Sequence, residues 1–484
     1  MSTEDNVNTS QKGIGTYNVG SNVVGNKRYF INGAFYKPGG PVFLMTEGSD
    51  TANRKWISMN NTWLTYAERL GALCLLLEHR FYGHSQPTGD LSTASLRYLS
   101  SRQALADIVN FRTKVAKTAG LTRNKWVVFG GSYGGSLAVW SRIKHPDLFA
   151  AAVGSSAPML AKVNFYEYLE GVQNSLGTHN KECLKAVKEA YDQVVEMLKL
   201  PKYYSKLESD FMLCKNFKFN SVMDTTFFLE RLVLLVATNV QHNMDKKKKV
   251  GILRSTFKDT DPDPQRGQIK LRFGGFYVLY GEGNQVFIRI EDFCDIMTNT
   301  SLGSPYYRLV RIVHSVFKET FSLSFNADYD GKMKALSDSS INHHMPTQGR
   351  QWLYQSCTEF GFFKTTDSKN QPFTGVPLSY FVKPCSDVFG PEFNYDSLKT
   401  GVMSTNMYYG GFNVRGSKII FSNGSFDPWH TLGITKDISK DLPAVFIKGA
   451  GHCSEMFRQK ATDSAELIQA REKIFHILQK WLKE

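Results

Sequence analysis

The chain has 484 residues, of which 42% are hydrophobic and 21% are charged. This is the composition of an ordinary globular protein, and the length suffices for one large domain with an insertion or for two to three domains. No stretch approaches the roughly 20 consecutive apolar residues of a transmembrane helix, so we expect a soluble protein without a membrane span.

The charge balance is basic, because 58 lysines and arginines outnumber 44 aspartates and glutamates and give a formal net charge of +14. These basic residues are dispersed, apart from four consecutive lysines at positions 246–249. No nucleic-acid-binding motif accompanies that cluster. We therefore interpret the lysine run as a solvated loop and expect no nucleic-acid partner.

The first part of the chain, residues 1–158, alternates expected strands with expected helices. Apolar or hairpin-like runs predict strands around residues 28–31, 42–45, 72–77, 126–129 and 149–153. Two segments have the period and length of crossover helices, residues 63–70 and 102–111. Such alternation predicts a parallel sheet with helices on both faces.

Residues 130–135, with the sequence Gly-Gly-Ser-Tyr-Gly-Gly, follow the expected strand at residues 126–129. This pattern is typical of a nucleophile elbow, in which side chains at Gly130 and Gly134 would collide with a neighbouring strand and helix. The helical spacing of residues 136–143 would direct free N–H groups at Ser132. The motif predicts a hydrolase with Ser132 as nucleophile, and a glycine-rich turn with an incidental serine is the alternative.

The alternation is lost after residue 158. Residues 159–405 mix amphipathic helices, such as residues 182–198, with aromatic stretches, and we interpret them as an inserted, mainly helical cap domain. Strand and helix patterns return in residues 406–484, which we expect to complete the core. The elements expected there are strands at residues 418–421 and 444–447 and a helix at residues 464–482.

Two further residues complete a candidate catalytic set. Asp427 and His452 each follow a strand of the last segment, and the loops at the carboxyl ends of parallel strands share one edge of a sheet. Ser132, Asp427 and His452 therefore match the order of a serine, acid and histidine triad, although both later residues are also compatible with ordinary turns. Three rival histidines lie too close to Asp427 or precede the elbow: His430, His79 and His84.

A serine nucleophile also needs two N–H donors for the oxyanion. The first is expected from Tyr133, directly after the nucleophile, and the second from the loop that follows the strand at residues 42–45. That loop, residues 46–50, has the sequence Thr-Glu-Gly-Ser-Asp, and Glu47 is the candidate for the second donor.

Short motifs extend these observations over nearly the whole chain: Arg28-Tyr29-Phe30, Gly39-Gly40-Pro41, Glu78-His79-Arg80-Phe81-Tyr82-Gly83-His84-Ser85, Gln103-Ala104-Leu105-Ala106-Asp107, Trp352-Leu353-Tyr354-Gln355-Ser356-Cys357-Thr358-Glu359, Phe421-Ser422-Asn423-Gly424 and Asp427-Pro428-Trp429. With the elbow, they resemble the prolylcarboxypeptidase and dipeptidyl peptidase II family of serine peptidases, including its thymus-specific branch. The resemblance implies an α/β-hydrolase fold with a helical cap and the triad named above. It also implies cleavage after proline, with release of a C-terminal residue or an N-terminal dipeptide.

The resemblance assigns one substrate-binding residue. Trp429 matches the tryptophan that lines the proline pocket of the family, and an aromatic face suits the flat, apolar pyrrolidine ring. A core tryptophan packed under the loop is the alternative. The implied substrates are proline-containing peptides. The implied mechanism needs no cofactor and no metal.

One loop departs from the family pattern. The family usually has Gly-Gly-Glu-Gly or Gly-Asn-Glu-Gly after the third strand, where this chain has Glu47-Gly48-Ser49-Asp50. In dipeptide-releasing members that glutamate helps to hold the substrate amine, and an acid beside the oxyanion hole would oppose the developing negative charge. The altered loop motivates one alternative, a catalytically weak or inactive relative that acts as a secreted binding or interaction protein. The elbow alone motivates another, an esterase or lipase on the same fold.

Cysteines and glycosylation sequons bear on localisation. Five of the seven cysteines lie between positions 183 and 385, which suggests disulfides in the cap, whereas Cys74 lies in an expected buried strand. Sequons begin at Asn8, Asn60, Asn299 and Asn423. The first six residues lack the features of a signal peptide and, taken literally, predict a chain that is not exported. By resemblance we nevertheless expect a secreted or lysosomal protein, with a homodimer among the open oligomeric states.

Overall fold

The computed structural model describes residues 20–24, 27–58, 61–214, 217–243, 288–320, 325–342 and 348–484. Several features of the sequence lie outside these residues. They are the first six residues, the sequons that begin at Asn8 and Asn60, and the lysine run at 246–249.

An eight-stranded sheet has the order β1-β2-β4-β3-β5-β6-β9-β10. Its strands are β1 (Gly20–Val24), β2 (Lys27–Asn32), β3 (Val42–Thr46), β4 (Leu73–Leu77), β5 (Trp126–Gly131), β6 (Ala151–Ser155), β9 (Ile419–Gly424) and β10 (Ala444–Ile447). The hairpin strand β2 pairs antiparallel with β1 and β4, and the other neighbouring pairs are parallel. The predicted parallel sheet, with a hairpin at its start, is confirmed.

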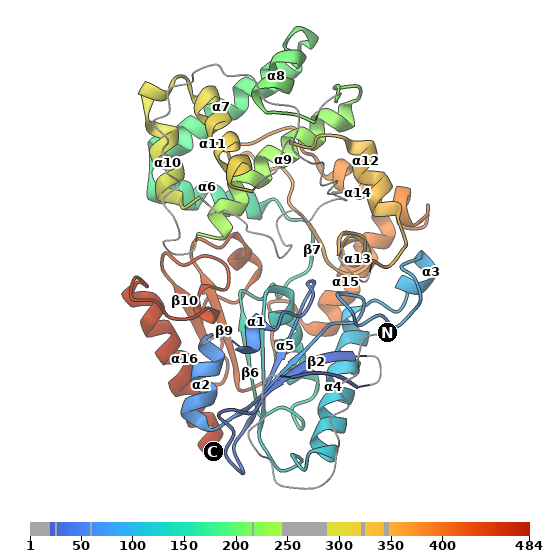
Figure 1. Ribbon diagram of the computed structural model, residues 1–484, viewed down its shortest axis with the longest axis vertical. Helices are drawn as coiled ribbons and strands as arrows, with labels where there is room; N and C mark the ends of the chain where they lie inside the picture. The colour runs from blue at the N-terminus through green and yellow to red at the C-terminus, as the bar shows by residue number, and fades with distance from the viewer. Residues whose placement is uncertain are drawn as a thin grey trace, which may run out of the picture.

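The sheet is buried on both faces because successive side chains of each strand point to opposite sides. In β3, Val42 and Leu44 pack with α4 (Ser101–Thr118) and α5 (Ser132–Lys144). Phe43 and Met45 belong to the opposite core, which α2 (Thr62–Leu70) and α16 (Ala465–Lys483) cover. Figure 1 shows α2 and α16 on one side of the sheet and α4 on the other. These helices include the two crossover helices that the sequence predicts, and α4 is longer than expected.

Helices dominate the chain between β6 and β9. They are α6 (Glu167–His179), α7 (Lys181–Leu198), α8 (Tyr204–Asp210), α9 (Val222–Gln241), α10 (Ile290–Thr298), α11 (Pro305–Thr320), α12 (Tyr329–Ser337), α13 (Gly349–Gln355), α14 (Leu378–Phe389) and α15 (Tyr395–Tyr409). The short helices α1 (Lys55–Ser58) and α3 (Thr93–Leu96) belong to the first half of the chain. A two-stranded parallel sheet of β7 (Lys162–Asn164) and β8 (Gly361–Phe363) lies between this helical part and the large sheet (Figure 1).

Two disulfides join elements of this helical part. Cys183–Cys294 links α7 to α10 across a sequence separation of 111 residues, and Cys357–Cys385 links the turn after α13 to α14. The prediction of disulfides in the inserted region is therefore confirmed. Cys74, by contrast, is fully buried in β4, as the sequence indicates.

The last helix before β9 packs against the large sheet's own helices. The ring of Tyr409 at the end of α15 stacks on Trp140 of α5, with ring centroids 3.8 Å apart. The bounds 1–158, 159–405 and 406–484 of the three segments stay a prediction. Among the residues that the structure describes, no helix is both long and apolar enough to cross a membrane.

Candidate active site

Ser132 stands where β5 turns into α5, with a backbone φ of 56° in the left-handed region. The turn is closed so tightly that a Cβ atom at Gly130 would come 2.1 Å from the carbonyl oxygen of Gly134. A Cβ at Gly134 would come 2.5 Å from the carbonyl oxygen of Thr46 on β3. The approach of helix α5 thus requires glycine at position 130, and the approach of strand β3 requires glycine at position 134, as the elbow motif predicts. The geometry holds Ser132 above the sheet at the start of a helix.

Asp427 and His452 meet at the same edge of the sheet. The Asp427 carboxylate is completely buried, and its Oδ2 lies 2.8 Å from Nδ1 of His452. The other carboxylate oxygen accepts the backbone N–H of Trp429 at 3.1 Å. Both residues stand on loops that follow β9 and β10, as the sequence predicts. This contact fixes the orientation of the imidazole and leaves its Nε2 atom on the far side of the ring from Asp427.

The electrostatic environment of His452 favours its charged form. Burial disfavours a charged ring, but the Asp427 carboxylate and the neighbouring Cys453 together outweigh burial and raise the pKa of His452 well above its usual value of 6.5. The backbone around this histidine is anchored on two sides. Its N–H donates to the carbonyl of Gln241 at 2.7 Å, and the N–H of Cys453 donates to Oγ of Ser156 at 2.9 Å.

The two expected oxyanion donors differ in their availability. Tyr133 lies in the first turn of α5, where backbone N–H groups have no partner within the helix. The N–H of Glu47 instead donates to the Leu77 carbonyl at 3.1 Å and thereby extends the ladder between β3 and β4. The prediction that Glu47 supplies the second donor therefore does not hold for its N–H. The next residue, Gly48, lies against the start of α5, where a Cβ at Gly48 would be 2.7 Å from the Gly134 nitrogen.

The Glu47 side chain is a partly buried acid that lines the same cavity as Ser132. Within the described part of the chain, its Oε1 atom has no hydrogen-bond partner. Burial, reinforced by the negative charges of Asp50 and Glu78, raises the pKa of Glu47 to about 8. Glu47 is therefore protonated at acidic pH and mostly protonated at pH 7, so that it places little negative charge next to Ser132.

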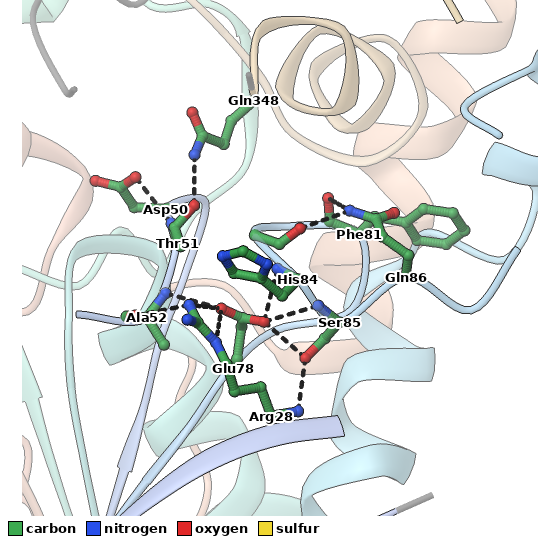
Figure 2. Close-up of polar contacts among 11 residues, drawn as sticks. Arg28, Asp50, Thr51, Ala52, Glu78, Phe81, His84, Ser85, Gln86 and Gln348 are labelled. Carbon is green, nitrogen blue, oxygen red and sulfur yellow. Dashed lines mark hydrogen bonds and ion pairs between the residues drawn. The ribbon is translucent and has the colours of Figure 1, made fainter. Parts of the chain in front are cut away.

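A buried ion pair holds the loop that carries Glu47 and Gly48 (Figure 2). Arg28 on β2 pairs with Glu78 after β4, and a second guanidinium hydrogen bond reaches the Ala52 carbonyl at 2.9 Å. Glu78 also accepts the N–H of Ala52 at 3.2 Å and both the N–H and the hydroxyl of Ser85, at 2.7 and 2.8 Å. Two of the motifs that carry the family resemblance, the segments 28–30 and 78–85, thus support this loop.

Residues from two sequence motifs, the segments 78–85 and 352–359, hold the side chain of Tyr133 in place. Its hydroxyl is contacted by Nε2 of His79 at 3.1 Å and by the side-chain amide of Gln355 at 3.1 Å. Gln355 in turn donates to Glu359 at 2.9 Å. The two ring nitrogens of His79 are thereby occupied, since Nδ1 lies 2.6 Å from the Arg80 carbonyl, and burial lowers the pKa of His79 to about 3. His79 is a structural residue rather than a rival base.

The other rival histidines also lie in different surroundings. Nδ1 of His430 contacts the backbone carbonyl of Asp427, 2.6 Å away, and not its carboxylate. The backbone N–H of His84 donates to Glu78 at 2.9 Å, within the network that supports the loop after β3. His452 is the histidine that faces the Asp427 carboxylate.

Ser132 and His452 line one cavity of about 700 Å³, between the sheet edge and the helical part of the chain. One wall is aromatic: Trp429 is 7% exposed and lies 5.2 Å from Phe362, measured between ring centroids. The cavity thus offers a flat apolar surface beside the candidate nucleophile, and charged side chains such as Lys364 complete its lining.

This protein is an α/β-hydrolase with a helical cap. The class is defined by the strand order of the large sheet, by the elbow at Ser132 and by the contact between Asp427 and His452. The chain belongs to the serine carboxypeptidase S28 family of serine peptidases, whose sequence profile matches residues 17–260 and 276–474. It is 33% identical over 477 residues to the thymus-specific serine protease of Mus musculus, covering 95% of this chain and 84% of that protein. It is 24% identical over 470 residues to the human lysosomal Pro-X carboxypeptidase, covering 95% and 84% respectively.

Sequence reasoning missed three residues of this site. Gln241, the last residue of α9, binds the His452 N–H through its carbonyl, and its side chain accepts the Trp429 indole N–H at 3.2 Å. His242 places its ring 5.9 Å from that of His452, and burial lowers its pKa to about 3. Lys364 follows β8 and faces the cavity. All three come from the helical part, where no local motif marks them.

Proposed function

We propose that this serine peptidase is an exopeptidase that cleaves after proline at a peptide terminus through an acyl-enzyme. The observation that carries the proposal is the 2.8 Å contact between Asp427 and His452 at the cavity that Ser132 also lines. Membership in the S28 family supports the peptidase class, and one relative is named for a Pro-X carboxypeptidase activity.

The proposed reaction proceeds in two halves. His452 removes the proton from Ser132 while the serine oxygen attacks the carbonyl carbon of the scissile bond, and Asp427 stabilises the imidazolium. The carbon–nitrogen bond breaks as His452 passes the proton to the leaving amine. Water then attacks the ester on Ser132, loses its proton to His452 and releases the acid product and the free serine. The reaction consumes one water and needs no cofactor.

We assign the oxyanion donors to the backbone N–H groups of Tyr133 and Gly48. The N–H of Tyr133 belongs to the open first turn of α5, and Gly48 packs against that turn. Protonation of Glu47 at acidic and neutral pH removes the repulsion that would weaken this hole. Protonation of Glu47 thus weakens the argument that an acid in this loop makes the protein an inactive relative. Among the described residues of the site, none favours an esterase over a peptidase.

The proposed proline pocket is the aromatic wall at Trp429. Phe362, whose ring is nearly perpendicular to the indole at 88°, forms the adjacent surface. A pyrrolidine ring is flat and apolar, and burial against such faces stabilises its complex without any charged partner. The two disulfides and the relative named as lysosomal support a lysosomal or secreted location.

The test is covalent labelling with a fluorophosphonate probe, followed by hydrolysis of peptides that contain one proline. We expect labelling of the natural protein that becomes faster as the pH rises from 5 to 8, because His452 must lose its proton to act as the base, and none of the Ser132→Ala variant. The matched control is Ser136→Ala, one helical turn further along α5, where the hydroxyl donates to the Pro158 carbonyl and does not line the cavity. Absence of Ser132-dependent labelling across this pH range refutes the proposed mechanism.

A further inference from the structure

Lys364 is a cation inside the cavity without an anionic partner. It follows β8 directly, and the pairing of β8 with β7 places it beside the aromatic wall. Its Nζ atom lies 4.0 Å from the ring centroid of Tyr168 and 4.9 Å from that of Trp429. Among the residues that the structure describes, these two ring faces are its contacts, and no hydrogen bond or ion pair holds the ammonium group.

The two carboxylates whose charges act on Lys364 already bind other groups. Asp427 and Glu230 are the acids whose charges act on Lys364. Asp427 holds His452 at 2.8 Å. The Glu230 carboxylate accepts hydrogen bonds from the Lys332 ammonium at 3.0 Å and from the Tyr380 hydroxyl at 2.6 Å. An ammonium group in such surroundings is under-compensated, and burial lowers its pKa to about 8.

The acids of the cavity are poorly suited to a substrate amine. Glu47 is protonated over the acidic and neutral range, and Glu230 is neutralised by Lys332. Asp50 uses one carboxylate oxygen to accept the Thr51 N–H at 2.9 Å (Figure 2). Among the described residues that line the cavity, Glu47 is thus mostly uncharged and Glu230 is paired with Lys332. A substrate carboxylate, by contrast, would meet the ammonium group of Lys364.

We propose that Lys364 binds a carboxylate of the substrate peptide and thereby directs the enzyme to the carboxyl end of peptides. The inference rests on the proposed function and selects one of the two chain ends. A charge-assisted hydrogen bond to the ammonium would compensate the partly buried cation while the aromatic wall holds the residue before the scissile bond. The carboxylate has two sources: the α-carboxylate of a single residue after the scissile bond, and an aspartate or glutamate side chain of the substrate.

Binding to the Ser132→Ala variant tests the inference without any turnover. Calorimetry compares N-blocked Pro-Phe carrying a free carboxylate with its C-terminal amide, and N-blocked Glu-Phe amide with N-blocked Gln-Phe amide. We expect the free acid to bind roughly 10- to 100-fold more tightly than its amide, as for a hydrogen bond to a charged group. Adding Lys364→Met should abolish that ratio, Lys364→Arg should keep most of it, and the exposed control Lys369→Met should leave it unchanged.

The possible outcomes distinguish a chain-end carboxylate from a side-chain carboxylate. They also distinguish the role of Lys364 from the proposed serine peptidase mechanism. A ratio that appears only between the glutamate and glutamine peptides supports carboxylate binding by Lys364 and overturns its assignment to the chain end. Equal effects of Lys364→Met on acids and amides overturn the inference entirely, as does preferred cleavage of unblocked Xaa-Pro reporters by the natural enzyme. Because binding is measured without the nucleophile, a failure here leaves the Ser132 labelling result untouched, and the converse also holds.

A measurement on the natural enzyme covers the case in which substitutions at Lys364 perturb folding. The KM ratio of amide to free acid should fall as the pH rises through about 8, where Lys364 loses its charge. The charged and titratable groups packed around Lys364 are Asp427, His242 and Glu230. His242 stays neutral above its pKa of about 3, so it does not produce the same change. Glu47 lines the same cavity with a pKa that is also about 8, so the measurement is repeated with the E47Q variant, in which the fall should persist. A KM ratio that stays constant from pH 6 to 9 counts against the inference.

Discussion

Replacing Glu47 by glutamine tests whether the acid next to the nucleophile is protonated. The folded protein holds this carboxyl with a pKa of about 8, against 4.5 for a carboxyl in the unfolded chain. Between these pH values the folded state therefore binds a proton that the unfolded state has released. The stability of the natural protein should fall as the pH rises through this window, because ionisation favours the unfolded chain. The E47Q variant has no such proton to lose.

The size of the effect follows from the width of the window. Each pH unit within it corresponds to about 1.4 kcal/mol, so the natural protein should lose about 3 kcal/mol relative to E47Q between pH 5 and pH 7. Urea unfolding followed by tryptophan fluorescence measures this difference. The matched control is Glu68→Gln, an exposed carboxylate on α2. Its stability difference from the natural protein should not vary with pH in this way.

A stability difference between the natural protein and E47Q that is equal at pH 5 and pH 7 refutes the reasoning. The labelling rate of Ser132 gives a second check, since a protonated Glu47 should not oppose the oxyanion. We expect E47Q to label within about threefold of the natural protein at pH 5 to 7, a difference below 1 kcal/mol in the barrier. A much faster variant at pH 7 would show that Glu47 is ionised there and restrains the nucleophile.

Three further predictions concern the triad, the elbow and the cap. Asp427→Asn should lower kcat by roughly 10⁴-fold while leaving the fold intact, as measured by peptide hydrolysis and circular dichroism. Gly134→Ala should destabilise the protein by about 1–3 kcal/mol in urea unfolding, because its Cβ would meet a β3 carbonyl at 2.5 Å. The control Gly89→Ala meets nothing within 4 Å and should be neutral. Removing the longer disulfide through Cys183→Ser should cost about 4–5 kcal/mol on the same scale, given its 111-residue separation.

The core and the candidate triad could be predicted because each depends on a local rule. Apolar runs of four to six residues become strands that are buried on both faces, and parallel strands bring their carboxyl ends to one edge. Ser132, Asp427 and His452 all stand at such ends. The glycine requirement at the elbow is likewise local, since residues four apart on one turn collide.

Other parts of the site depend on pairings that the sequence does not display. We propose Gly48 rather than Glu47 as the second oxyanion donor, because the β3–β4 ladder continues one hydrogen bond beyond the last residue of β3 and occupies the Glu47 N–H. Lys364 enters the cavity because β8 pairs with a strand from a distant part of the chain. Neither pairing leaves a periodic pattern, and a single lysine after three aromatic or glycine residues reads as an ordinary loop residue.

The helical cap holds part of the candidate triad in place, so it cannot be treated as a lid that moves independently of the catalytic site. The carbonyl of Gln241, at the end of cap helix α9, accepts the N–H of His452 at 2.7 Å. The side chain of the same residue accepts hydrogen bonds from Tyr168 at 2.6 Å and from Trp429 at 3.2 Å. One cap residue therefore fixes both the loop of the candidate base and the wall of the candidate proline pocket. A displacement of α9 would release His452 and reshape that pocket together, so access to the cavity and the geometry of catalysis are coupled through a single helix end.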